Sequence, residues 1–168
     1  MTTFESKTSC RPSAPVNLRE SSRPVADIGT LTQAVQAAVR DLDENTLRLV
    51  ARRDAGLAFQ PKALLALLTY CYAREIYGSE AVEDVMRRDD NFRQLCHNEF
   101  PGARLIRRFR RDNREPLRLC LIAALRFLAV QKLQAGVVTN VKDTHLVEEA
   151  NRRIIMAMFI DNMELDSD

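Results

Sequence analysis

Seven arginines lie between Arg104 and Arg118, and they are the residues of this sequence whose type and spacing best suit a chemical task. Guanidinium groups bind phosphates and the edges of guanine bases. Two acids share the stretch, so its local charge is +5, against +2 for the whole chain of 168 residues. Basic charge is therefore concentrated at one place in the chain. This is the pattern of a nucleic-acid-binding surface.

The same stretch divides cleanly on a helical wheel of about 100° per residue. The side expected to pack carries Leu105, Ile106, Phe109 and Asn113. The opposite, cationic side carries Arg104, Arg107, Arg108 and Arg111. A recognition helix is one interpretation, and a solvated amphipathic helix without a ligand is the other. Under the first interpretation the candidate DNA-binding residues are Arg104, Arg107, Arg108, Arg110, Arg111 and Arg114.

The other reactive side chains form no recognised catalytic or metal-binding pattern. A cluster of acids near the C-terminal end has no glycine turn of the kind found in calcium loops. Its members are Asp161, Glu164, Asp166 and Asp168. Cys96, His97 and His145 match no zinc spacing, and no glycine-rich phosphate loop occurs. We therefore expect no catalytic residue, no metal and no cofactor.

Composition indicates an all-helical protein of the cytoplasm. The chain is 46% hydrophobic but only 6% aromatic, with no Trp and five Gly, which favours helices over a sandwich or barrel. The four cysteines show no CxxC spacing, as expected of reduced thiols in a cytoplasmic protein. The most apolar stretch, Leu117 to Leu133, contains charged residues and is shorter than the ~20 residues of a membrane span. We expect a core helix there and no membrane partner.

Breakers and periodicity divide the first half of the chain. Residues 1–29 are rich in Ser, Thr, Pro and Arg and are predicted to form a disordered arm. Thr30, in a capping-box pattern with Gln33, should open a helix that runs to about residue 42. Asp43 is expected to cap a second, short helix ended by Gly56. Pro61 should then open a central apolar helix, ended by Gly78.

The second half is predicted to be helical as well. Ser79 should cap the next helix, and Pro101 and Gly102 should turn the chain into the arginine helix. Asn113 is expected to cap the long core helix. After it comes a β-branched run over 137–141 and then a last helix over about 144–163. The residues that we expect this last helix to pack are Leu146, Ile154, Ile155, Met158 and Phe159.

These elements predict an all-α fold of six to seven helices over residues 30–164, followed by an acidic tail over 165–168. Its centre, formed by residues 79–97 and 103–113, resembles a helix-turn-helix unit. From Asp143 to Asp168 seven acids face two arginines, a local charge of −5. That acidic end either shields the arginines, as a mimic of nucleic acid, or only keeps the chain in solution.

Residues 59–133 also carry motifs of a known family. The specific pieces are Phe59 with Pro61, the helix from Leu64 to Tyr72, Gly78-Ser79, Val82-Glu83, Asp89, Phe92-Arg93-x-Leu95, Pro101 and Ile106-x-Arg108-Phe109-Arg110-Arg111. At these spacings the stretch resembles the N-terminal domain of bacterial insertion-sequence transposases of the InsH kind. Two positions depart from that family's usual pattern: Leu105 stands where a Thr is usual, and Glu80 where a basic residue is usual.

The resemblance implies a helical domain that binds the ends of a mobile element ahead of a DDE nuclease domain. A DDE nuclease holds two metals on carboxylates from a sheet, and this sequence offers neither the sheet nor matching acids. We therefore expect a truncated or split transposase that binds double-stranded DNA at terminal inverted repeats without catalysis. A separate DDE chain would supply the nuclease, and homodimerisation is open. The alternative is a helical interaction module that pairs with itself or with an intact transposase and regulates it.

Overall fold

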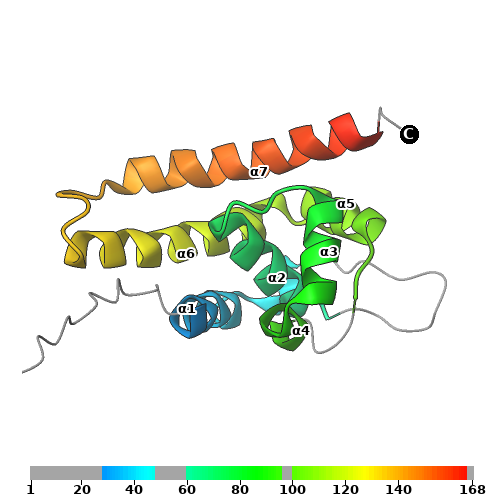
Figure 1. Cartoon of the computed structure of the whole chain (residues 1–168), viewed down its shortest axis with the longest axis horizontal. Coiled ribbons are helices and arrows are strands. Elements are labelled where there is room, and N and C mark those ends of the chain that lie inside the picture. The colour runs from blue at the N-terminus through cyan, green and yellow to red at the C-terminus, as the bar shows by residue number, and fades with distance from the viewer. Residues whose placement is uncertain (1–27, 48–59, 96–99, 166–168) are drawn as a thin grey trace, which may run out of the picture.

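The structure, a computed structural model, describes residues 28–47, 60–95 and 100–165. Its described residues form helices and no strand, which confirms the all-α prediction (Figure 1). The elements are α1 (Ile28–Arg40), a 3-10 turn (Glu44–Thr46), α2 (Pro61–Ala73), α3 (Ser79–Arg88), α4 (Asp90–Leu95), α5 (Ala103–Asp112), α6 (Arg114–Gln134) and α7 (Asp143–Leu165). The β-branched run over 137–141 lies in the loop between α6 and α7.

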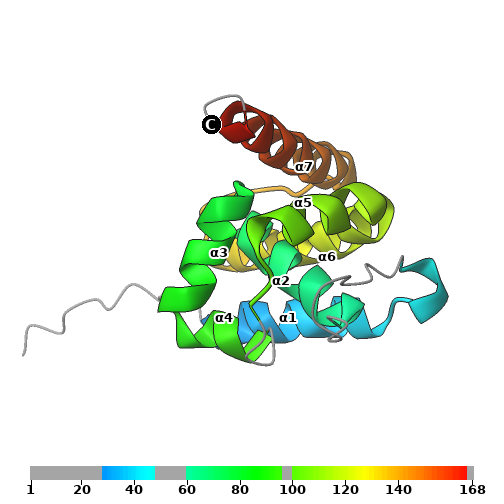
Figure 2. The ribbon, with the colours of Figure 1, turned by 90° about the vertical axis from the view of Figure 1, so that its right-hand side faces the viewer.

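Helix α2 is the centre of the core, as its apolar sequence predicts. Every residue from Ala63 to Ala73 is buried, and Pro61 occupies the first turn, where its missing N–H costs no hydrogen bond. Helices α1 and α6 pack against α2, and α4 adds an edge-on ring contact from Phe92 to Tyr70 with centroids 5.1 Å apart. Figure 2 shows α2 between α1 on one side and α6 on the other, with α7 beyond α6. A helix that is apolar all round needs such cover on all sides.

Helix α2 ends earlier than predicted and by a different residue. Glu75 takes a left-handed conformation, with φ of 65°, and the N–H of Ile76 donates to the carbonyl of Cys71. This is a Schellman ending, which usually employs glycine. Gly78 instead precedes α3 in an extended conformation, so the prediction that it ends α2 is wrong. A Cβ at Gly78 would approach the Oε1 atom of Glu164 to 2.8 Å and the Cγ2 atom of Ile160 to 3.1 Å, so a larger residue would require these side chains to shift.

Helices α5 and α6 follow one another with a break at Asn113, as predicted. Asn113 occupies the N-cap position of α6, but its side chain makes no capping hydrogen bond there; its amide instead donates back to the carbonyl of Phe109 in α5. The wheel of α5 is confirmed for Ile106, Phe109 and Asn113, all buried, while Leu105 is half-buried. Pro116 lies in the first turn of α6. The burial of Ile106 and Phe109 therefore determines which face of α5 points toward solvent.

Helix α7 packs along α6 and ends above α3 and α5 (Figure 1). Its buried apolar residues include Leu146, Ile154 and Ala157. Ile155 and Phe159 were expected in the core, but they are 54% and 58% exposed, so that prediction is wrong. Adjacent residues on a helix point about 100° apart. Ile154 and Ile155 therefore cannot both face the same core, and the structure buries Ile154.

Two predicted boundaries also change. Helix α1 begins at Ile28, so Thr30 lies inside it and does not cap it, and the predicted arm loses its last two residues. Asp43 does cap a short turn, because its side chain accepts the N–H of Asn45 at 3.0 Å. The rest of that predicted helix falls outside the described residues, as do residues 1–27 of the arm and 166–168 of the tail. None of the described helices has the length and apolarity needed to cross a membrane.

Candidate nucleic-acid interface

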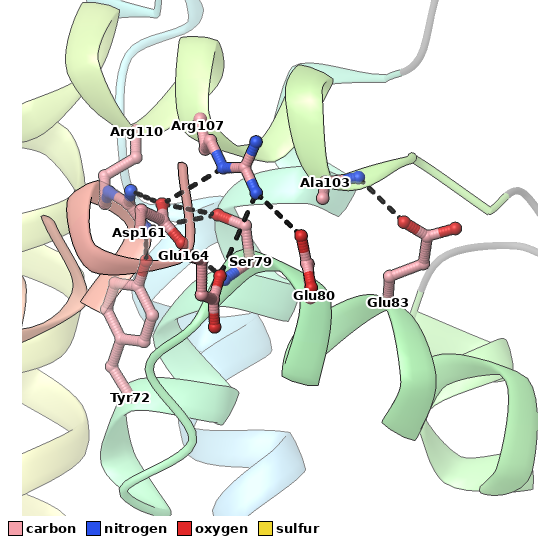
Figure 3. A network of polar contacts seen from close by, with 9 residues as sticks. All are labelled: Tyr72, Ser79, Glu80, Glu83, Ala103, Arg107, Arg110, Asp161 and Glu164. Carbon is pink, nitrogen blue, oxygen red and sulfur yellow. Dashed lines mark hydrogen bonds and ion pairs between the residues drawn. The ribbon is translucent and has the colours of Figure 1, made fainter. Parts of the chain in front are cut away.

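Helix α5 is held at its start by a carboxylate from α3. Gly102 precedes the helix with extended backbone, and the N–H of Ala103 donates to the Oε2 atom of Glu83 at 2.9 Å (Figure 3). Glu83 also accepts from Arg87, and these two contacts, that from Arg87 first, lower the pKa of its carboxyl. A negative charge at a helix N-terminus meets the positive end of the helix dipole. Glu83 thereby sets the position at which the arginine helix begins.

Arg110 lies in the interior and not on the predicted binding surface. It is 3% exposed and is bonded to the Asp161 carboxylate of α7, while its guanidinium also donates to the hydroxyl of Tyr72 at 2.7 Å. Burial raises the pKa of Tyr72, which therefore stays neutral. A charge buried in this way needs its partner and cannot be released to a phosphate without loss. Arg110, one of the six candidate DNA-binding residues, therefore stabilises the fold through these buried contacts.

Asp161 joins the start of α3 to this cluster. It accepts the backbone N–H of Ser79 at 2.8 Å on one oxygen and the Ser79 hydroxyl at 2.7 Å on the other. The prediction that Ser79 caps α3 is wrong, because Gly78 occupies the cap position and Ser79 is the first helical residue. A carboxylate 82 residues away in sequence thus does the work of a capping side chain.

Arg153 of α7 contacts the end of α2, whereas Asp161 contacts the start of α3; the two residues lie on either side of the turn between these helices. Its guanidinium donates to the carbonyls of Tyr72 and Ala73 at 2.7 and 3.0 Å, which end α2. Helix α7 therefore places a cation at the C-terminus of α2 and an anion at the N-terminus of α3. The cation meets the partial negative charge at the C-terminus of α2, and the anion meets the partial positive charge at the N-terminus of α3, so both contacts are favourable. The turn between α2 and α3 is in this way fastened to α7.

Arg107 is surrounded by acids. Its guanidinium lies 3.2 Å from Glu80, and 3.8 Å from both Asp161 and Glu164, and its side chain is only 21% exposed (Figure 3). Burial, followed by repulsion from Glu80 and Asp161, raises the pKa of the Glu164 carboxyl. The acidic end of the chain thus meets the arginine helix, as the shielding alternative expects, and Arg107 faces α3 and α7.

The outward face of α5 keeps three arginines, and Arg114 at the start of α6 is exposed beside them. We call this set the arginine ridge: Arg104, Arg108, Arg111 and Arg114. The side chains of Arg108 and Arg111 are 54% and 73% exposed, and both form an ion pair with Asp112, at 3.8 and 3.3 Å. Such exposed pairs within one helix contribute little and exchange readily with solvent. The ridge spans ~10 Å from Arg104 to Arg111 at 1.5 Å per residue.

A groove of about 760 Å³ runs between α5 and α7 beside the ridge. Its lining residues are Arg104, Arg107, Arg108, Arg110, Arg111, Met158, Asp161, Asn162 and Leu165. Among the described residues no group of three or more His, Cys, Asp or Glu side chains has the arrangement of a metal site. Because five of the residues that line the groove are arginines, the chemistry that this region offers is the binding of anions.

Sequence reasoning missed Tyr72, Ser79, Asp161 and Arg153 as parts of one network. A usable signal exists for the last two. Arg153 and Asp161 share the face of α7 that buries Leu146, Ile154 and Ala157. A charged residue on an otherwise apolar helix face needs a partner from another element. The sequence pattern could thus have marked both residues as bonded, but it could not have named their partners.

Comparison with known proteins adds no identification, since no family model, curated protein or solved structure matches the chain. The transposase resemblance therefore stays a prediction. So does the helix-turn-helix centre: α3 packs against α5, but residues 96–99 between α4 and α5 lie outside the described part of the chain.

Proposed function

We propose that this protein binds duplex DNA through the arginine ridge of α5, as the DNA-binding part of a truncated or split transposase without nuclease activity. The observation that carries the proposal is the outward row of Arg104, Arg108 and Arg111, whose side chains are exposed and whose ion pairs within the described part of the chain are those of Arg108 and Arg111 with Asp112. The apolar seam of Ile106 and Phe109 anchors the opposite face. A rigid helix with a free cationic face suits the major groove, which is about 12 Å wide.

The proposal differs from the sequence-based one in the residues that it uses. Arg107 and Arg110 are engaged by acids, so neither is assigned to DNA. Arg108 takes the base-reading role, and Arg104, Arg111 and Arg114 contact phosphates. The proposed target is the terminal inverted repeats of an insertion sequence, and a second chain would supply the DDE domain. Cytoplasmic location follows from the same proposal.

The experiment is a mobility-shift titration with duplex DNA over a salt series, comparing wild type with two matched variants. Arg108→Ala removes a ridge arginine whose side chain is 54% exposed, and Arg126→Ala removes an arginine of α6 that is 53% exposed. Log affinity should fall with log salt by ~0.9 per phosphate contacted. Arg108→Ala should weaken binding by ~1 to 3 kcal/mol on the preferred site, and Arg126→Ala should match wild type. Identical curves for all three proteins, or no shift at low salt, would sink the proposal.

One observation favours the interaction-module alternative. Ile155, Phe159 and Met163 recur at four-residue spacing on α7 and are 54%, 58% and 57% exposed. An apolar row of this kind is a frequent mark of protein association. Sedimentation of wild type against Phe159→Glu tests it: a dimer that becomes a monomer in the variant, with no shift of duplex DNA by either protein, would make self-association the function. A wild-type monomer excludes pairing with itself.

A further inference from the structure

Arg107 lies on the same side of α5 as two arginines of the ridge, but acids from other helices hold it. It follows Arg104 by three residues and precedes Arg111 by four, and residues at these spacings are neighbours on a helix surface. Its side chain is only 21% exposed, against 73% for Arg111. Helices α3 and α7 each place a glutamate beside it, Glu80 at 3.2 Å and Glu164 at 3.8 Å (Figure 3). The charge of Arg107 is thus kept from the ridge by contacts that a moving side chain could release.

The contact between Arg107 and Glu164 is incomplete. A separation of 3.8 Å is beyond hydrogen-bond distance. Within the described part of the chain, the Nε atom of Arg107 and the Oε2 atom of Glu164 have no hydrogen-bond partner, although both atoms are buried. Burial, followed by repulsion from Glu80 and Asp161, also raises the pKa of the Glu164 carboxyl, so its charged form is disfavoured here. An anion that forms charge-assisted hydrogen bonds with Arg107 can therefore replace Glu164 at little cost.

Glu164 can move while the rest of α7 stays packed. Asp161 fastens α7 to the interior through its bonds to Ser79 and Arg110. Glu164 lies one turn beyond this anchor with its side chain 29% exposed, and α7 ends at Leu165. The last turn of a helix opens more readily than its middle. Movement of this turn leaves the buried contacts of Asp161 intact.

The glycine at position 78 makes room for the Glu164 side chain. A Cβ there would lie 2.8 Å from the Oε1 atom of Glu164 and 3.1 Å from the Cγ2 atom of Ile160. The backbone of Gly78 is extended, with φ of −61°, which any residue can adopt. Alanine at this position would therefore displace the end of the Glu164 side chain without straining the backbone or changing a charge. The position of Glu164 can in this way be tested separately from its charge.

We propose that Glu164 makes an autoinhibitory contact with Arg107, which withholds this arginine from the ridge until a DNA phosphate takes the place of the carboxylate. The inference rests on the proposed function, because it adds a conditional contact to the same helix. Glu80 does not prevent the exchange, since its side chain is 58% exposed and such an ion pair contributes little. Once released, Arg107 contacts one phosphate more than the four arginines of the ridge do.

The test measures the binding of a labelled blunt duplex to the full chain by fluorescence anisotropy over a salt series. Gly78→Ala should bind about eightfold tighter than wild type near 0.1 M salt, because one more phosphate contact adds ~0.9 to the salt slope. Glu164→Gln should give a similar gain. Arg107→Ala, added to Gly78→Ala, should restore the wild-type affinity and slope. Circular dichroism confirms that each variant is folded.

The matched control for charge is Glu148→Gln. It removes the same charge from an exposed position about four turns earlier on α7, and it should bind the duplex as wild type does. If Glu148→Gln gains as much as Glu164→Gln, the gain comes from net charge and the autoinhibitory contact is refuted.

The remaining outcomes separate the two proposals. Measurable duplex binding with the same affinity and slope for wild type and Gly78→Ala overturns the autoinhibitory contact and leaves duplex binding intact. A gain in Gly78→Ala that persists without Arg107 also overturns it, because another group must then supply the added affinity. No duplex binding by any of the proteins overturns both proposals.

Discussion

Replacement of Asp161 is the sharpest test of how this fold is held together. Its carboxylate accepts two hydrogen bonds from Ser79 and neutralises Arg110, both buried. Asp161→Ala leaves the Arg110 charge without its buried carboxylate and the Ser79 N–H without its acceptor. Breaking a buried ion pair on one side costs about 3 to 5 kcal/mol, and an unsatisfied N–H adds about 1 to 3 kcal/mol. We expect the free energy of unfolding to fall by about 5 kcal/mol. This is less than the sum of the two costs, because Arg110 retains its hydrogen bond to Tyr72.

Asp161→Asn gives a second, smaller step. The amide has the same shape, and its oxygen can still accept the Ser79 N–H, but its NH₂ group faces the donors of Arg110. The cost should then be about 3 kcal/mol, which for a chain of this length lowers the melting temperature by about 10 °C. Glu164→Gln is the control in the same cluster. Because its carboxyl has a raised pKa, loss of the charge should change stability by less than about 1 kcal/mol.

The measurement is urea unfolding followed by circular dichroism at neutral pH for the four proteins. Wild type and Glu164→Gln should have nearly the same free energy of unfolding, Asp161→Asn should be less stable, and Asp161→Ala should be the least stable of the four. A loss below about 1 kcal/mol for Asp161→Ala would refute the reasoning, since it would mean that Arg110 finds water or another partner at little cost.

Three further predictions concern the core, a turn and pH. Phe109→Ala removes a ring that is 1% exposed and should cost about 3 to 5 kcal/mol in urea unfolding; an unchanged melting temperature would show that the apolar face of α5 is not packed. At Glu75, with φ of 65°, Gly should be more stable than Ala by about 1 kcal/mol, because both lose the carboxylate and only Ala keeps the strain; equal melting curves would contradict this. Hydrogen bonds from Arg152 and then Arg153 hold the pKa of Glu149 at about 2, below its unfolded value of about 4.3. Glu149 thus stabilises the fold above about pH 4.3, and this contribution is lost as the pH falls toward 2. Glu149→Gln should be less stable than wild type at pH 7, by a margin that shrinks in acid, and a margin independent of pH would refute the assignment.

Local signals in the sequence determined most of the helices. Pro61 and the apolar run after it specify α2, the pair Asn113 and Pro116 specifies the break before α6, and the alternation of Ile106 and Phe109 with arginines specifies the buried side of α5. Each of these features acts over one or two turns of chain. Periodicity and the backbone restrictions of proline are therefore sufficient to predict it.

The tertiary structure alone decided which arginines remain free. Arg107 and Arg108 are neighbours in a basic run, yet the first meets acids of α3 and α7 and the second points outward. Arg110 became interior because Asp161, 51 residues later in the chain, reaches it across the α3–α5 junction. A helical wheel predicts the direction in which each side chain leaves the helix, but it does not predict which other helices pack against that side. The partner of a charge over such separations depends on how helices pack, which no local pattern in the sequence records.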